Sequence, residues 1–154
     1  MSESIWEHIR ILVMPVLLHC GCLRREKVDT EVSGIAIAGY FNAGQDCTAA
    51  TRVLAAPGIH DDFVSALSEY ARSSSPVGLP DDEEALFGPV SNANQLERVS
   101  GFISRLPSHA TVSAGGNRRS DLGDGFYLEP TVLSGLHQDD EAIQNEIFGP
   151  VITV

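Results

Sequence analysis

Helix-type and strand-type segments alternate from Asp29 to Val154, and this alternation constrains the fold more than any other feature of the chain. Phe63, Leu67 and Tyr70 recur at helical spacing, whereas short β-type runs elsewhere end at glycine or proline. Such alternation is typical of an α/β fold with a largely parallel sheet and flanking helices. We predict that fold for a single domain, because 154 residues are enough for one core.

The periodicity and the breaker residues predict the individual elements. We expect helices near Val32–Tyr40, from Asp61 to Ser73, from an N-cap at Ser91 to Leu106, and from Asp139 to Asn145. Strands are expected at Arg52–Ala55, Thr111–Ala114 and Val151–Val154, and a strand-like run broken by Pro130 at Phe126–Leu133. Gly78–Val90 and Asn117–Gly125 are predicted loops, because glycine, proline and polar residues dominate them.

Residues 1–28 form an atypical N-terminal segment. The apolar run Ile9–Leu18 is shorter than the roughly 20 residues that a helix needs to span a bilayer. Glu3 and Glu7 stand where a signal peptide carries basic residues. We interpret the run as a buried strand or short helix, or alternatively as an extension foreign to the fold. Residues 29–154 are assigned to one domain.

Charge and cysteine content narrow the partners and the compartment. Lys+Arg of 10 against Asp+Glu of 21 gives a formal net charge of −11, which leaves no basic footprint for nucleic acid or an anionic membrane. Cys20, Cys22 and Cys47 are an odd number, which argues against a disulfide framework and predicts a reducing, cytoplasmic setting. No second ligand cluster complements Cys20 and Cys22, so we expect no metal site.

The stretch Gly39–Leu54 places Cys47 behind a Gly-Gln-Asp turn, between a helix-type and a strand-type run. Gly44 allows a positive φ or a close approach of the backbone to a ligand, and free backbone N–H groups at such a junction favour a thiolate. Asp46 works against the thiolate, because it is a like charge beside it. From the residues alone, Cys47 is either a small buried hydrophobe or a nucleophile.

Four motifs resemble, in order, the landmarks of the aldehyde dehydrogenase superfamily. They are Phe41–Cys47 (FNAGQDC), Phe87–Val90 (FGPV), Gly125–Val132 (GFYLEPTV) and Asn145–Val151 (NEIFGPV). The resemblance implies that residues 29–154 are a truncated part of that family's catalytic domain.

The resemblance also implies a mechanism. Cys47 would be the catalytic nucleophile that attacks an aldehyde as thiolate, giving a thiohemiacetal and then a thioester that is hydrolysed to the carboxylic acid. NAD or NADP would accept the hydride. Glu146 would bind the hydroxyls of the nicotinamide ribose, and Phe148 would lie beside the cofactor. From the residues alone, the ordinary role of Glu146 is that of a solvated acid in the first turn or at the end of a helix, and the ordinary role of Phe148 is core packing.

Within the family, Asn42–Ala50 most resembles the aminobutyraldehyde and betaine-aldehyde group. Asp46 would then be a substrate-binding residue that attracts a cationic amino group, its alternative role being a turn-capping aspartate. The family's oligomerisation elements lie outside the matched part, so a homo-oligomer stays open.

Two features of the family pattern are missing. The family's general-base glutamate lies in a Glu-Leu-Gly-Gly segment, whereas Val13–Cys22 contains neither an acid nor a Gly-Gly pair. No glycine-rich phosphate cradle occurs in the sequence. We therefore expect weak catalysis or none from this chain alone. The alternatives are an inactive interaction module, or a thiol-dependent esterase that pairs Cys47 with His60 or His109.

Overall fold

The computed structural model of the protein describes residues 10–11, 20–21, 28–74 and 76–154. Strands β1 (Arg10–Ile11) and β2 (Cys20–Gly21) pair antiparallel as a separate two-stranded sheet. Most of the apolar run Ile9–Leu18, interpreted above as a buried strand or short helix, lies outside the described residues. The same holds for Cys22.

A three-stranded mixed sheet forms the centre of the domain. Its strands β3 (Thr111–Ala114), β4 (Thr131–Ser134) and β5 (Val151–Thr153) follow one another in that order. β4 and β5 run parallel, and Arg52 forms a further parallel bridge with Thr153 on β5. The α/β class is confirmed.

The prediction of a largely parallel sheet is wrong for β3, which pairs antiparallel with β4. A parallel pair would need a crossover, usually a helix of some length. The connection between β3 and β4 contains only the short 3-10 helix η4 (Ser120–Leu122), and it folds back on itself through an antiparallel bridge between Arg118 and Leu128. β3 therefore returns beside β4 as an extended hairpin.

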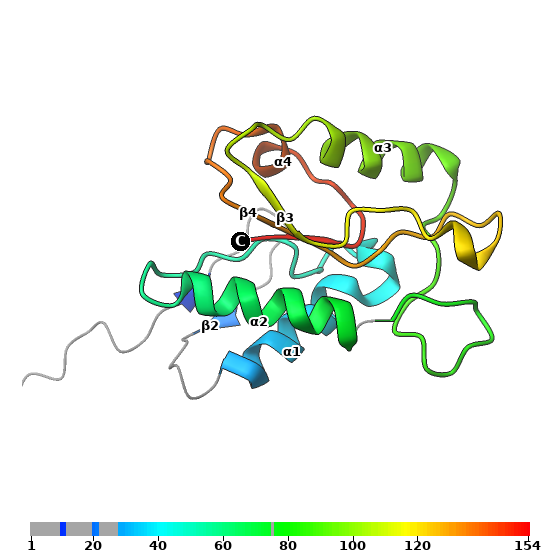
Figure 1. Ribbon diagram of the computed structural model, residues 1–154, viewed down its shortest axis with the longest axis horizontal. Coiled ribbons are helices and arrows are strands. Elements are labelled where there is room, and N and C mark those ends of the chain that lie inside the picture. Colours follow the sequence, from blue (N-terminus) through cyan, green and yellow to red (C-terminus); the bar gives the residue numbers. More distant parts are fainter. Residues whose placement is uncertain (1–9, 12–19, 22–27, 75) are drawn as a thin grey trace, which may run out of the picture.

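Helices cover both faces of this sheet. Figure 1 shows α1 (Val28–Tyr40) and α2 (His60–Ser73) on one side, and α3 (Ala93–Ser104) and α4 (Glu141–Gln144) on the other. α2 packs against β3 and β4 with Phe63 and Leu67 completely buried, as their helical spacing predicts. The four expected helices are confirmed, with ends shifted by a few residues.

Three local predictions need correction. Asn92, not Ser91, is the N-cap of α3, because its side-chain oxygen accepts a hydrogen bond from the Gln95 N–H at 2.9 Å. In the run Phe126–Leu133 the expected break at Pro130 holds, but only the part after it forms a strand, which begins at Thr131. The strand expected over Arg52–Ala55 is reduced to the single Arg52 bridge.

The C-terminal end of α1 is fixed against the sheet. The buried Tyr40 hydroxyl donates to the Thr131 carbonyl oxygen at 3.1 Å, and burial raises the pKa of Tyr40, which keeps the phenol a neutral donor. At Gly39 a Cβ atom would lie 2.6 Å from Ile152 Cδ1 and 2.9 Å from the Ala50 carbonyl oxygen. α1 can therefore lie this close to β5 only with glycine at position 39.

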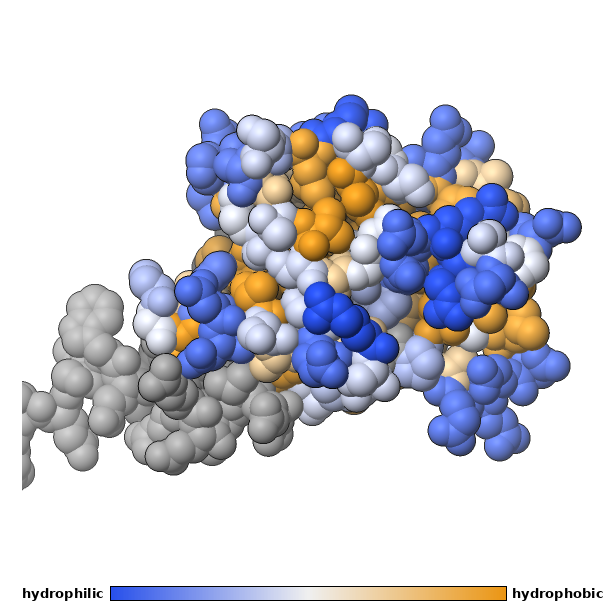
Figure 2. Space-filling view, in the orientation of Figure 1, coloured by the Kyte–Doolittle hydropathy of each residue, from blue (hydrophilic) through white to orange (hydrophobic). Residues whose placement is uncertain are grey.

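Some apolar surface stays in contact with solvent. In Figure 2, separate apolar areas are visible among hydrophilic side chains on the face shown. The large exposed apolar side chains of the described part are Ile37, Phe41, Leu54, Leu79 and Val112. None of the helices described is both long and apolar enough to cross a membrane.

Two glycines of α1 provide a matched test of this packing. Gly39→Ala should lower the free energy of unfolding by about 1–3 kcal/mol, because the added methyl group overpacks the contact with β5. Gly34→Ala, with no atom within 4 Å of its added Cβ, should leave stability unchanged or raise it by up to about 1 kcal/mol through helix propensity. Urea unfolding followed by circular dichroism measures both. Equal effects of the two substitutions would contradict this packing.

Candidate functional site

The turn before Cys47 has an unusual backbone. It is the 3-10 segment η3 (Phe41–Gly44), in which Asn42, Ala43 and Gly44 have φ angles of 52°, 56° and 68°. Left-handed backbone is uncommon for residues with a side chain and persists only where the surroundings hold it. Here Asn42 Nδ2 donates to the Gln45 carbonyl oxygen at 3.0 Å, and the Gln45 N–H donates to the Asn42 carbonyl oxygen at 3.1 Å. The turn is thus held by its own polar groups.

Gly44 brings this turn into backbone contact with a segment more than one hundred residues later. A Cβ atom at Gly44 would lie 2.0 Å from the Gly149 carbonyl oxygen and 2.9 Å from the Pro150 nitrogen. No side chain fits in that space, so both the positive φ and the close approach require glycine. The contact joins two of the four sequence motifs, the one that contains Cys47 and the one that contains Glu146 and Phe148.

Cys47 itself is exposed and its thiol is free. The interpretation as a small buried hydrophobe is therefore wrong. The preceding turn carries Cys47 outward, while its neighbours Ala49 and Ala50 are buried.

Asp46 caps the turn that carries Cys47. Its Oδ1 accepts hydrogen bonds from the Thr48 N–H at 2.8 Å and from the Thr48 hydroxyl at 2.9 Å. These two bonds, with a smaller contribution from the Cys47 side chain, hold the pKa of Asp46 below its usual value. Because the folded pKa is the lower one, the contribution of this turn to stability is present above the unfolded pKa and is lost as the pH falls through the folded pKa. The capping role is thus visible, and the substrate-binding role of Asp46 stays a prediction.

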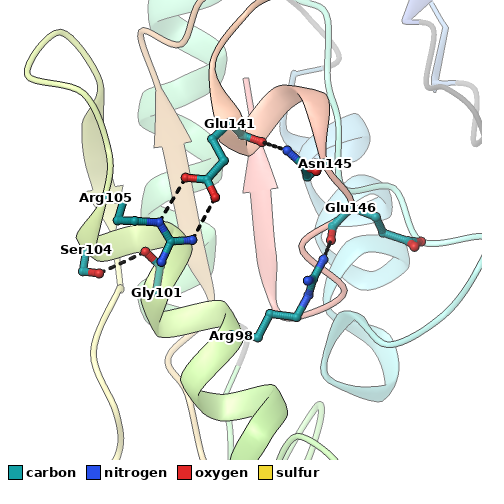
Figure 3. A network of polar contacts seen from close by, with 7 residues as sticks. All are labelled: Arg98, Gly101, Ser104, Arg105, Glu141, Asn145 and Glu146. Atoms are coloured by element: carbon teal, nitrogen blue, oxygen red, sulfur yellow. Dashed lines mark hydrogen bonds and ion pairs between the residues drawn. The ribbon is translucent and has the colours of Figure 1, made fainter.

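Glu146 presents its carboxylate to solvent. Its carbonyl oxygen accepts a hydrogen bond from Arg98 Nη2 on α3, and Figure 3 shows the carboxylate pointing away from Arg98. An exposed carboxylate of this kind can accept hydrogen bonds from the hydroxyl groups of a ligand.

Phe148 is partly buried and has a φ of 59°. Gln95 Nε2 donates to the Phe148 carbonyl oxygen at 2.6 Å and to the Ile147 carbonyl oxygen at 3.2 Å. The left-handed conformation of this bulky residue is therefore stabilised from α3.

Helix α3 and the residue just before its N-cap contact both segments. The Ser91 N–H, just before the helix, donates to Gln45 Oε1 at 3.1 Å. On the other side, a Cβ atom at Gly149 would lie 2.5 Å from Val99 Cγ2, so the chain there packs directly on the helix. α3 thus fixes the turn before Cys47 and the segment around Phe148 relative to each other.

An ion pair fixes the other end of α3. The Arg105 guanidinium binds both carboxylate oxygens of Glu141 on α4, at 3.1 and 2.9 Å, and it lowers the pKa of that carboxyl (Figure 3). Arg105 and Arg98 also lie over the Phe102 ring, 5.6 and 5.1 Å from its centroid. The Arg105–Glu141 ion pair thus joins α4 to α3, the helix that also carries Arg98.

The two histidines that an esterase would require are paired with other groups. His60 Nδ1 lies 2.8 Å from Asp61 Oδ1, and His109 Nε2 lies 2.9 Å from Asp140 Oδ2. The His109 ring also stacks on His137 with a centroid separation of 4.0 Å. Within residues 28–74 and 76–154, no group of three or more His, Cys, Asp or Glu side chains could hold a metal ion.

The residues that hold the candidate site residues in place were not predicted from the sequence. Gln45, Gln95 and Arg98 connect the segments through hydrogen bonds to the backbone. A glutamine or arginine on the polar side of a helix gives no signal of such a contact in one sequence. Only the period of α3, with Val99 and Phe102 buried, indicates the face on which Gln95 borders the core.

Comparison with protein families gives one match over most of the chain. The model described as "Aldehyde dehydrogenase family" matches residues 22–154. An aldehyde dehydrogenase of Emericella nidulans is 34% identical over 128 residues, which are 82% of this chain and 25% of that protein. One of Alternaria alternata is 38% identical over 116 residues, 75% of this chain and 23% of that protein.

Solved structures agree with these matches. Betaine aldehyde dehydrogenase from Staphylococcus aureus, solved in complex with NAD+, is 32% identical with a TM-score of 0.76, over 82% of this chain and 25% of that one. The E194S mutant of an aldehyde dehydrogenase from Bacillus cereus is 31% identical with a TM-score of 0.75, over the same shares. The chain spans about a quarter of the length of these relatives.

Gly44→Ala tests the backbone contact. The substitution should lower the free energy of unfolding by about 3 kcal/mol or more, because it adds a left-handed penalty to a collision with the Gly149 carbonyl. Gly58→Ala, whose added Cβ meets no atom within 4 Å, should stay within about 0.5 kcal/mol of the parent chain. Urea unfolding of the two variants makes the comparison. A Gly44→Ala chain as stable as Gly58→Ala would show that the contact is absent.

Proposed function

The chain belongs to the aldehyde dehydrogenase family, and on that premise we propose that its site serves the oxidation of an aldehyde to a carboxylic acid with NAD+ or NADP+. The observation that carries this proposal is the contact between Gly44 and Gly149. It joins the Cys47 turn to the segment of Glu146 and Phe148, the two elements that this reaction needs together.

Cys47 is the nucleophile in this proposal. Its thiolate attacks the aldehyde carbon, so that a carbon–sulfur bond forms and the carbonyl electron pair moves to oxygen. Protonation of that oxygen gives the thiohemiacetal, and the backbone N–H of Cys47 is a suitable donor to the oxyanion. The exposure of Cys47 supports this role, because a substrate can reach the sulfur.

Glu146 and Phe148 are the residues proposed to hold the nicotinamide end of the cofactor. When bound, NAD+ or NADP+ supplies the acceptor for the hydride that leaves the thiohemiacetal carbon. The exposed Glu146 carboxylate fits the ribose hydroxyl groups as a hydrogen-bond acceptor, and the partly buried Phe148 ring offers an apolar surface. NAD+ is present in the solved betaine aldehyde dehydrogenase to which the chain is similar.

Aminoaldehydes are the proposed substrate class. Asp46 stays ionised, because Thr48 lowers its pKa, and it adjoins the nucleophile in sequence. A carboxylate at that position would attract a cationic amino group on the substrate. The similarity to a betaine aldehyde dehydrogenase supports the same choice.

Hydrolysis of the thioester needs an activated water, and the sequence contains no counterpart of the family's Glu-Leu-Gly-Gly base segment. General-base assistance is typically worth about 10²–10⁴-fold. We propose that the site requires further polypeptide to complete turnover.

The binding half of the proposal has its own test. NAD+ should slow the alkylation of Cys47 by iodoacetamide in a saturable way, because the cofactor would occupy the space beside the thiol. Glu146→Gln should leave the alkylation rate without NAD+ unchanged. It should raise the NAD+ concentration that half-protects Cys47 about tenfold, because the substitution removes a charged hydrogen-bond acceptor. Glu97→Gln, an exposed glutamate of α3, is the matched control and should behave like the parent. Alkylation that is unaffected by saturating NAD+ would refute the proposed cofactor site.

Turnover by the chain alone should be undetectable. Purified chain is mixed with NAD+ and propanal or an aminoaldehyde, and the absorbance of reduced cofactor is followed. Turnover that disappears in Cys47→Ala would show that the chain needs no further base. Ester hydrolysis that depends on Cys47 but not on nucleotide would favour the esterase alternative.

A further inference from the structure

Three successive carbonyl groups are bound by two side chains of α3. Arg98 Nη2 donates to the Glu146 carbonyl oxygen, while Gln95 Nε2 donates to those of Ile147 at 3.2 Å and Phe148 at 2.6 Å. Gln95 and Arg98 are three residues apart, so they lie on the same side of the helix. The segment proposed to bind the cofactor is therefore held by its backbone from one helix.

The two carbonyls bound by Gln95 define a torsion angle. The φ angle of Phe148 is the rotation about its N–Cα bond, and the carbonyl carbons of Ile147 and Phe148 are its two ends. One NH₂ group that donates to both oxygens thus restrains the backbone of Phe148 on both sides of this bond, where φ is 59°. Both partners are acceptors, so only a donor at this position can form the two bonds.

The restraint matters because the conformation is unfavourable by itself. An aromatic residue in the left-handed region persists only where its surroundings hold it. Released from Gln95, Phe148 would turn toward the ordinary region, and both its ring and the backbone of the neighbouring Glu146 would change direction.

We propose that Gln95 is a positioning residue for the cofactor-binding segment. It fixes the left-handed backbone of Phe148 and, together with Arg98, aims Glu146 and Phe148 toward the ligand. This inference rests on the proposed function for the ligand's identity, but not for the conformational restraint.

Gln95→Glu is the sharpest variant, because it keeps the length of the side chain and replaces the donor by an acceptor that repels both carbonyls. Asn94→Asp adds the same charge one residue earlier, on an exposed position of the same helix turn, and serves as the control. Gln95→Met removes the donor without adding charge, and it covers the case in which the glutamate variant does not fold.

The first measurement needs no cofactor. In NMR spectra of isotope-labelled chain, Gln95→Glu and Gln95→Met should move the backbone resonances of Ile147, Phe148 and Gly149 and abolish the left-handed signature in the Phe148 coupling constant and carbon shifts. Asn94→Asp should preserve that signature. If Gln95 contributed only to global stability, its substitutions would lower the unfolding midpoint and leave the native Phe148 signature unchanged. A Phe148 signature unchanged in both Gln95 variants would overturn the inference.

The second measurement is the NAD+ concentration that half-protects Cys47 from iodoacetamide. Both Gln95 variants should raise it about tenfold or more, as expected for two lost hydrogen bonds, while Asn94→Asp should not. If the parent chain shows no protection, the proposed function fails, and the NMR result still decides the restraint. Protection at parental NAD+ concentrations in both Gln95 variants would refute the positioning role.

Discussion

The arrangement of the site depends on one close backbone contact, that between Gly44 and the Gly149 carbonyl. On one side of it, Tyr40 and Gly39 fix the end of α1 against the sheet, so the turn that follows has little freedom. On the other side, Gly149 packs on Val99 of α3. The cysteine turn and the Glu146–Phe148 segment are thereby parts of one packed unit, although a hundred residues separate them.

Strain concentrates at this contact. The non-glycine residues of the described part with positive φ are Asn42, Ala43 and Phe148, and all three lie next to it in sequence. Such residues cluster where a fold over-determines the backbone, and in enzymes this is often at the site of chemistry. Here the determinants are visible as side-chain hydrogen bonds from Asn42, Gln95 and Arg98.

Sequence patterns predicted the parts that depend on period and composition. The Phe63–Leu67 stripe gave α2 correctly, and the motif order gave the family. The choice between two adjacent capping residues was not predictable, and Asn92 caps α3 in place of Ser91. The direction of β3 was also not predicted: it pairs antiparallel with β4 because their connection lacks a crossover helix. The left-handed Phe148 was equally hidden, because it depends on a contact from Gln95, distant in sequence.

The segments proposed to act together all lie within the residues that match the family. The chain matches about a quarter of its relatives and includes the segments of Cys47, Glu146 and Phe148, while no counterpart of the family's base segment occurs in its sequence.

The contact of Gly44 with the Gly149–Pro150 backbone can be observed directly by NMR. The close approach of the two segments predicts a nuclear Overhauser peak between the Gly44 α-protons and the Pro150 δ-protons, alongside the peaks that pair β4 with β5. If the β4–β5 peaks are present and the Gly44–Pro150 peak is absent, the two segments are not in contact, and the site described for Cys47, Glu146 and Phe148 does not exist in the folded chain.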